Sequence, residues 1–207
     1  MTQLVDQIVD EVVKELKQKL FIEVEASGRH VHLAQRDIDV LFGVGYRLTP
    51  VKDLSQPGQY ACKERVTVTG TKGTLNNVIV LGPARKDSQV EVSLTDALIL
   101  GVKSPVRQSG DIKDTPGIVI SNGDKKVELA QGLIVAKRHV HITPEDARKF
   151  NVSDGESVKV KVFGERPLIF DDMIIRVSPD FRTYIHIDYD EANACGYTKG
   201  MWGMILK

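Results

Sequence analysis

The sequence predicts a mainly β protein built from β-barrels or a sandwich, with short helices and one amphipathic helix at its N-terminus. Three observations support this prediction. Short runs of β-forming residues recur between positions 21 and 187 and are separated by turn residues. One motif occurs twice, as Arg29-His30-Val31-His32 and Arg138-His139-Val140-His141, which indicates two related domains. Apolar residues near the N-terminus instead recur at helical spacing.

The chain begins with the predicted amphipathic helix, which extends to residue 20. Its apolar residues recur among acidic and basic ones and are Leu4, Val5, Ile8, Val9, Val12, Val13, Leu16 and Leu20. We expect this helix to pack against the body of the protein or against a second subunit, and we expect a homodimer on that basis. The alternative is an address or a partner-binding segment.

Short β-type runs follow the helix. The predicted strands are 21–26, 65–69, 77–81, 90–93, 117–120, 125–129, 133–136, 157–162, 173–177 and 183–187. The turn signals between them are Pro57-Gly58, Gly82-Pro83, Ser109-Gly110-Asp111, Asn122-Gly123-Asp124 and Asp154-Gly155.

A short helix is predicted after each His-Val-His motif, over residues 34–41 and 144–150. In the second helix Thr143 can cap the first turn, and Pro144 fits the first helical position. Glu145 and Asp146 favour the positive end of the helix dipole. The repeated unit is therefore a strand, the Arg-His-x-His motif and a short helix.

The five histidines lie in three places: the two motifs and His186, within Tyr184-Ile185-His186-Ile187-Asp188. Residues at i and i+2 of a strand point to the same face, so each motif can direct two imidazoles at one ion. Catalytic zinc sites often use three protein ligands and leave one position open. Two pairs and a single histidine would need further oxygen or sulfur ligands. The alternative is that His-Val-His occurs by accident in a strand with one polar face.

Composition restricts the class of protein. The chain of 207 residues has 28 basic and 28 acidic residues and a formal net charge of zero, which argues against a general nucleic-acid or membrane-surface binder. Neither a membrane-spanning run nor a secretory signal is recognised. Cys62 and Cys195 form no C-x-x-C motif and no disulfide framework, so we expect a reducing, cytoplasmic setting.

Three other stretches contain candidate functional residues. The turn at Gly82-Pro83-Ala84 presents Arg85 and Lys86, which could bind phosphate or remain a solvated surface turn. Alternation places Gln89, Glu91 and Ser93 on one face of a strand, so Glu91 is either a metal ligand or a solvent-facing carboxylate. Asp188 could orient an imidazole or cap the helix that follows.

Together these motifs resemble the phosphate propanoyltransferases, the PduL-type phosphotransacylases of bacterial microcompartments. The similarity covers nearly the whole chain after the first helix. It rests on both Arg-His-Val-His motifs and on the segments 82–85, 89–97, 105–111 and 186–194.

The resemblance implies two zinc ions per chain and reversible transfer of an acyl group between coenzyme A and phosphate. By position, His139, His141 and His186 would bind one zinc, and His30, His32 and Glu91 would bind the other. Arg85 would be the catalytic residue that holds phosphate. The resemblance assigns no residue to coenzyme A.

The resemblance also implies two related β-barrel domains. Residues 1–20 would form the N-terminal helix, residues 28–136 the first barrel, and residues 137–207 the second, completed by a strand over residues 21–27. Members targeted to microcompartments carry an additional amphipathic extension, whereas one short N-terminal helix is predicted here. We expect a cytoplasmic enzyme, which is either free or inside a microcompartment with contacts to shell or cargo. We expect neither nucleic acid nor a membrane as partner.

The implied chemistry is direct attack of phosphate on an acyl thioester, with propanoyl-CoA or acetyl-CoA as substrate. Glu64, Arg65, Arg107 and Ser109 are further candidates for this site. Arg29 and Arg138 could bind substrate anions or brace the adjacent strands. The competing hypotheses are a two-zinc hydrolase, in which hydroxide attacks, and a pair of structural zinc modules, which usually contain more cysteine.

Overall fold

A computed structural model describes residues 2–206, without the side chains of Thr2, Gln3, Leu4, Asp6, Ile8, Asp10, Lys14, Lys17 and Gln18. The chain divides into two compact units. Of the described residues, the barrel unit comprises 2–26, 138–187 and 191–206. The sheet unit comprises residues 27–137 and 188–190.

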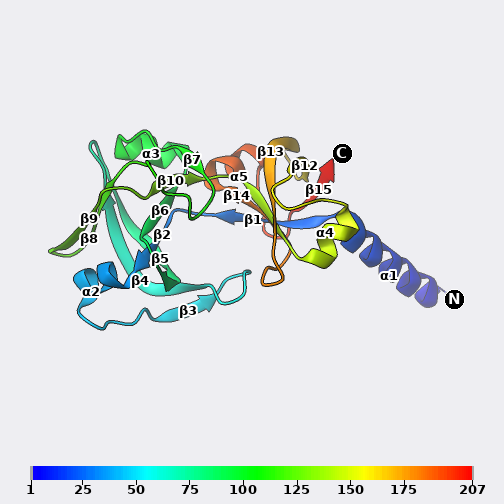
Figure 1. Ribbon diagram of the computed structural model, residues 1–207. Coiled ribbons are helices and arrows are strands. Elements are labelled where there is room, and N and C mark those ends of the chain that lie inside the picture. The colour runs from blue at the N-terminus through cyan, green and yellow to red at the C-terminus, as the bar shows by residue number, and fades with distance from the viewer. Residues whose placement is uncertain (1, 207) are drawn as a thin grey trace. The chain divides into compact units, whose positions relative to one another are not determined.

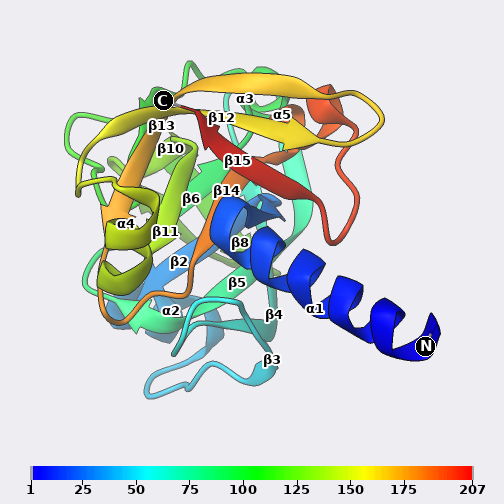
Figure 2. The same cartoon turned by 90° about the vertical axis from the view of Figure 1, so that its right-hand side faces the viewer.

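In the barrel unit, six strands of the described chain close into a barrel (Figures 1 and 2). Around the barrel they are β1 (Ile22–Ser27), β14 (Tyr184–Asp188), β11 (His139–Ile142), β13 (Leu168–Val177), β12 (Ser157–Phe163) and β15 (Trp202–Leu206). β1 and β15, from the two ends of the chain, pair antiparallel and complete the barrel. Alternate residues of β11 and β14 point into an apolar core that includes Val140, Ile142, Ile185 and Ile187.

Two short helices belong wholly or mainly to the barrel unit. The predicted helix 144–150 is confirmed as α4 (Pro144–Phe150), where the Thr143 hydroxyl accepts a hydrogen bond of 3.1 Å from the Asp146 amide. Asn151 ends α4 in the left-handed conformation, with φ 53°. α5 (Tyr189–Cys195) follows β14 directly, as predicted.

The predicted N-terminal helix is confirmed as α1 (Thr2–Leu20), which leads into β1 (Figure 1). Six of its predicted apolar side chains are described and all are exposed: Val5, Val9, Val12, Val13, Leu16 and Leu20. The side chains of Leu4 and Ile8 lie outside the described part. The expected packing against the body is therefore wrong for the six described side chains, and packing against a second subunit stays a prediction. Among the described residues, no helix combines the length and apolarity needed to cross a membrane.

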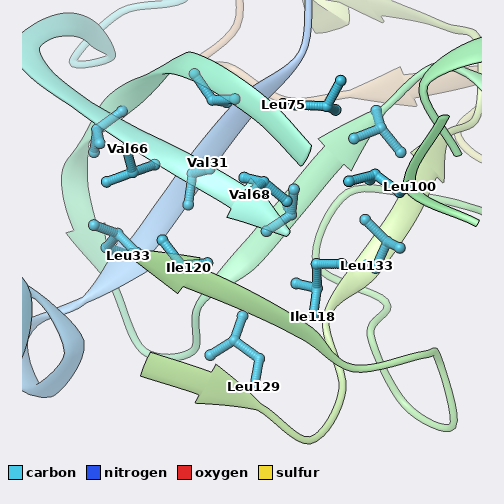
Figure 3. Close-up of a cluster of buried hydrophobic side chains, with 14 of the residues drawn as sticks. Val31, Leu33, Val66, Val68, Leu75, Leu100, Ile118, Ile120, Leu129 and Leu133 are labelled. Carbon is cyan, nitrogen blue, oxygen red and sulfur yellow. The ribbon is translucent and has the colours of Figure 1, made fainter. Parts of the chain in front are cut away.

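In the sheet unit, nine strands of the described chain form one sheet. Along the sheet they are β7 (Val106–Arg107), β10 (Leu133–Ala136), β6 (Gln89–Val92), β2 (His30–Ala34), β5 (Thr74–Arg85), β4 (Tyr60–Thr69), β8 (Ile118–Asn122) and β9 (Lys125–Leu129), with β3 (Pro50–Asp53) paired to β4. The sheet curls around a core in which Val31, Val68, Ile120 and Leu133 converge (Figure 3). Each such buried Val or Leu stabilises the fold by about 1.5–3 kcal/mol.

Two helices lie in the sheet unit. α2 (Gln35–Phe42) follows β2 and agrees with the prediction for residues 34–41. α3 (Leu94–Leu100) follows β6 and was not predicted. A capping box begins α3, because the Ser93 hydroxyl accepts from the Asp96 amide and the Asp96 carboxylate accepts from the Ser93 amide. This Ser-x-x-Asp pattern was the sequence signal for α3.

The mainly β fold class is confirmed, with one closed barrel and one curled half-barrel sheet. The turn predicted at Gly82-Pro83 is wrong, because both residues lie inside β5. Between the pairs His32–Leu81 and Ala34–Arg85, β5 contains three residues where β2 contains only Leu33, which makes a bulge. A Cβ atom at Gly82 would lie 2.2 Å from the Tyr60 ring, so any larger residue there would require the ring to move.

Candidate functional site

The two His-Val-His motifs occupy equivalent positions in the two units. In the sheet unit, β2 pairs antiparallel with β6, so that His30 lies opposite Glu91. In the barrel unit, β11 pairs antiparallel with β14, so that His139 lies opposite His186. β2 and β11 each pair on their other side with a parallel strand, β5 and β13 respectively. The repeat seen in the sequence therefore extends to strand pairing around each motif.

Strand alternation separates the imidazoles from the core. Val31 and Leu33 are fully buried in the core of the sheet unit, and Val140 and Ile142 are fully buried in that of the barrel unit. The intervening histidines point to the opposite face of each strand. The prediction that each motif lies on a β-strand is confirmed.

In the sheet unit, His30, His32 and Glu91 gather into one buried triad. One potential ligand atom from each residue lies within 4.8 Å of the others. His30 Nε2 lies 3.5 Å from Glu91 Oε2, and His32 Nε2 lies 3.7 Å from Glu91 Oε1. His30 Nδ1 donates a 2.8 Å hydrogen bond to the Gly28 carbonyl, so that in the neutral ring Nε2 carries the lone pair that faces the triad.

Electrostatics in this triad favour a cation. Burial raises the pKa of Glu91, but His30, His32 and Ser109 lower it more strongly, so the pKa lies well below its usual range. Burial lowers the pKa of His30, yet Glu91 outweighs this and raises it. Burial and the neighbouring His30 hold the pKa of His32 well below 6.5. Glu91 is thus a carboxylate and His32 a neutral imidazole, which are the forms that bind metal.

In the barrel unit, His139, His141 and His186 form a second triad, again with one potential ligand atom each within 4.8 Å of the others. His141 Nδ1 lies 3.2 Å from His186 Nε2. His186 Nδ1 lies 3.7 Å from Glu25 Oε2 on β1. Burial and the charges of His139 and Arg176 lower the pKa of His141 to about 3, so its imidazole is neutral at physiological pH.

Both triads fit a divalent metal ion. His32 Nδ1 and His141 Nε2 are buried ring nitrogens without a hydrogen-bond partner among the described residues, although such atoms normally have one. Three convergent imidazole or carboxylate ligands leave one position of a tetrahedral ion open. These donor types suit zinc better than magnesium or calcium, which prefer all-oxygen sites.

Arg85 is connected to the triad of the sheet unit through Ser109. Arg85 Nη1 donates to Ser109 Oγ over 3.1 Å, and Ser109 Oγ donates to Glu91 Oε1 over 2.7 Å. Gln89 Nε2 donates to Glu91 Oε1 over 2.6 Å, and the Gly110 amide donates to Gln89 Oε1 over 2.7 Å. A guanidinium, a hydroxyl and an amide therefore converge beside the carboxylate of Glu91.

The other sequence candidates lie in different surroundings. Lys86 is exposed beyond the end of β5. Glu64 accepts hydrogen bonds from the Tyr46 hydroxyl and the Thr49 amide, and Arg65 Nη1 donates to backbone carbonyls of residues 62–64. Arg107 forms an exposed ion pair of 3.7 Å with Asp111. A role for Glu64 or Arg65 in the reaction stays a prediction.

Sequence reasoning did not identify the contacts of Gln89 and Glu25 with the triads. The alternation in β6 correctly placed Gln89 on the face of Glu91 and so carried a signal for it. Glu25 approaches His186 from β1, and no spacing in the sequence connects these two residues. Asp188, the expected partner of an imidazole, lies at the end of β14 immediately before α5.

A family model and several curated relatives match most of this chain. The family model of phosphate propanoyltransferase matches residues 23–198. A phosphate propanoyltransferase of Clostridioides difficile (strain 630) is 62% identical over 207 residues, which is 100% of this chain and 99% of that protein. The phosphate propanoyltransferase of Enterococcus faecalis is 62% identical over 204 residues, covering 98% of this chain and 97% of its own.

A more divergent phosphate propanoyltransferase, from Thermotoga maritima, is 53% identical over 193 residues, covering 93% of this chain and 92% of its own. Similarity of this extent covers both histidine motifs and both units. The chain therefore belongs to the phosphate propanoyltransferase family of acyltransferases.

Proposed function

We propose that this enzyme reversibly converts a short-chain acyl-CoA and inorganic phosphate to an acyl phosphate and coenzyme A. The observation that supports this most strongly is the hydrogen-bonded connection from Arg85 through Ser109 to Glu91, which joins an anion-binding guanidinium to a candidate metal triad. Propanoyl-CoA and acetyl-CoA are the proposed substrates, and the names of the relatives favour propanoyl-CoA.

The proposed metal is zinc, with two ions per chain. His30, His32 and Glu91 would hold one ion, and His139, His141 and His186 would hold the other. When bound, zinc supplies Lewis-acid stabilisation of the negative charge that develops during acyl transfer.

Arg85 is the proposed phosphate-binding catalytic residue. Its guanidinium can donate two parallel hydrogen bonds to phosphate oxygens, while its contact with Ser109 fixes one side of the group. A phosphate oxygen then forms a bond to the thioester carbonyl carbon. The C–S bond breaks, its electron pair leaves with the coenzyme A thiolate, and the acyl phosphate is the other product.

Direct attack by phosphate requires no acyl-cysteine intermediate. Cys62 and Cys195 are fully buried thiols. Burial raises the pKa of Cys62 to about 11 and also raises the pKa of Cys195. Since the thiolate is the reactive form, neither thiol is suited to act as a nucleophile.

We propose a cytoplasmic homodimer, free or inside a bacterial microcompartment with contacts to its shell or cargo. The exposed apolar side chains of α1, among them Val9 and Leu16, support a role for that helix in association.

The decisive experiment measures coenzyme A release from propanoyl-CoA and acetyl-CoA, with and without phosphate, on protein of known zinc content. Release that requires phosphate, disappears on chelation and returns with zinc is the expected result. Release without phosphate would favour a hydrolase. No release from zinc-replete protein would favour a binding module.

A further inference from the structure

Arg29 and Arg138 directly precede the two His-Val-His motifs, and each forms an ion pair with a carboxylate of a helix. Arg29 Nη2 lies 2.8 Å from Asp96 Oδ1 in α3. Arg138 Nη1 lies 2.6 Å from Glu191 Oε1 in α5. Asp96 follows Glu91 by five residues, and Glu191 follows His186 by five residues. The same ion pair therefore recurs at the same place in both repeats.

In the sheet unit, Asp96 joins two segments that contribute to the triad. Its side chain is buried, and its second oxygen accepts a 3.3 Å hydrogen bond from the Ser93 amide. Ser93 follows the last residue of β6, two positions after Glu91, and Arg29 directly precedes His30, the first residue of β2. One carboxylate thus ties the ends of the two ligand-bearing strands together.

In the barrel unit, Arg138 makes an equivalent connection. Besides its ion pair with Glu191, Arg138 Nε donates a 2.7 Å hydrogen bond to the Asp171 carbonyl on β13. Its guanidinium carbon lies 5.7 Å from the centre of the Phe170 ring. These contacts link the start of β11 to β13 and to the helix that follows His186.

We propose that Arg29 and Arg138 are positioning residues that hold the ligands of each triad at metal-binding separation. The strand ladders set His30 opposite Glu91 and His139 opposite His186, and the ion pairs fix the ends of those strands. A prearranged triad loses less conformational freedom when an ion binds, which raises affinity. This inference rests on the proposed function, because it requires that the triads bind metal.

The ion pairs argue against a role for these arginines in binding substrate. Asp96 and Glu191 place a negative charge directly against each guanidinium, and the Asp96 side chain is only 4% exposed. An approaching phosphate would be repelled by these carboxylates. A positioning role predicts an effect on zinc affinity, whereas a substrate role predicts an effect on the KM.

The test uses backgrounds that each keep one triad. His139→Ala leaves the triad of the sheet unit, and His30→Ala leaves that of the barrel unit. The variants are Arg29→Gln and Asp96→Asn in the first background, and Arg138→Gln and Glu191→Gln in the second. Each should weaken zinc binding about tenfold, which is the smaller effect expected when a group that supports a metal ligand is removed. Competition with a chromophoric chelator measures the affinity, and circular dichroism checks folding.

Two further measurements separate positioning from general damage. Arg29→Gln combined with Asp96→Asn should weaken zinc binding no more than either change alone, because both remove the same ion pair. Arg29→Lys, which keeps the charge, should restore part of the affinity. Arg148→Gln, at an exposed arginine of α4, is the control in the second background and should bind zinc like its parent.

The inference would be overturned if each background binds one zinc and the arginine variants bind it with unchanged affinity. The proposed function would then remain intact. A raised KM for phosphate or acyl-CoA at saturating zinc, with unchanged zinc affinity, would instead assign the arginines to substrate. Absence of zinc binding in both backgrounds would refute the metal sites themselves, and this inference with them.

Discussion

Glu91 and His186 hold the same structural position in the two repeats: each lies opposite the first histidine of its motif on the neighbouring antiparallel strand. The two triads therefore differ by one charge, since Glu91 is a carboxylate and His186 an imidazole. A zinc ion would retain more positive charge in the all-histidine triad. If both triads hold zinc as proposed, the two ions would therefore differ in acidity.

Replacing Glu91 by histidine should retain zinc in the sheet unit but destabilise the protein. Three imidazoles can still bind the ion, as His139, His141 and His186 are proposed to do. However, Gln89 Nε2 and Ser109 Oγ would lose the carboxylate that both donate to, and a hydrogen bond to a charged group contributes about 1.5–3 kcal/mol. Zinc analysis and urea unfolding measure the two effects. Glu91→Ala is the control and should lose the ion, so equal zinc loss in both variants would contradict the equivalence.

Removing the guanidinium of Arg85 should impair phosphate binding more than acyl-CoA binding. Charge-assisted hydrogen bonds contribute about 1.5–3 kcal/mol, which corresponds to an increase of roughly 10–150-fold in the KM for phosphate. Steady-state kinetics of Arg85→Ala with each substrate varied in turn measures the difference. Lys86→Ala is the matched control at the neighbouring exposed position. An equal rise in both KM values would indicate a structural role for Arg85.

Replacing Ser88 by alanine should destabilise the segment that carries Arg85. The Ser88 hydroxyl donates to the buried carboxylate of Asp37 and accepts a 2.8 Å hydrogen bond from the Ala34 amide. The substitution removes both hydrogen bonds, so we expect a loss of about 1–3 kcal/mol in the free energy of unfolding, and a higher KM for phosphate. Asp37→Asn keeps an acceptor oxygen and should cost less. Chemical denaturation compares the variants.

Replacing Tyr46 by phenylalanine should destabilise the protein at neutral pH more than in acid. Burial raises the pKa of Glu64, but the hydrogen bonds from Tyr46 and Thr49 lower it by a larger amount. The pKa of Glu64 therefore lies below its usual value. The stabilisation is present above the unfolded pKa of about 4.3 and is lost as pH falls through the folded value. We expect Tyr46→Phe to cost about 1.5 kcal/mol at pH 7.

Urea unfolding of wild-type and Tyr46→Phe protein at neutral and acidic pH tests this expectation. In a Glu64→Gln background the cost of Tyr46→Phe should be smaller and independent of pH, because no carboxylate remains to titrate. A cost that stays constant across pH in the wild-type background would show that the Tyr46 hydroxyl does not act through the charge of Glu64.

Prediction from sequence succeeded where local pattern and structure agree. Alternation over residues 157–162 and 173–177 predicted β12 and part of β13, and the Thr143-Pro144 pair predicted α4. It failed for β3, β7 and β15, which are short or lack clear alternation and form strands because a neighbour pairs with them. The bulge at Gly82-Pro83 was mistaken for a turn, since the same residues serve both purposes.

By itself, the sequence determined the repeated motif, the two faces of each motif strand and the family, because these depend on residue type and on spacing within a few positions. Only the tertiary structure decided that Arg29 meets Asp96, that Arg85 reaches Glu91 through Ser109, and that Glu25 approaches His186. These contacts join residues from separate segments of the chain. Strand register and the curl of the sheet set their distances, and no local spacing in the sequence encodes that register.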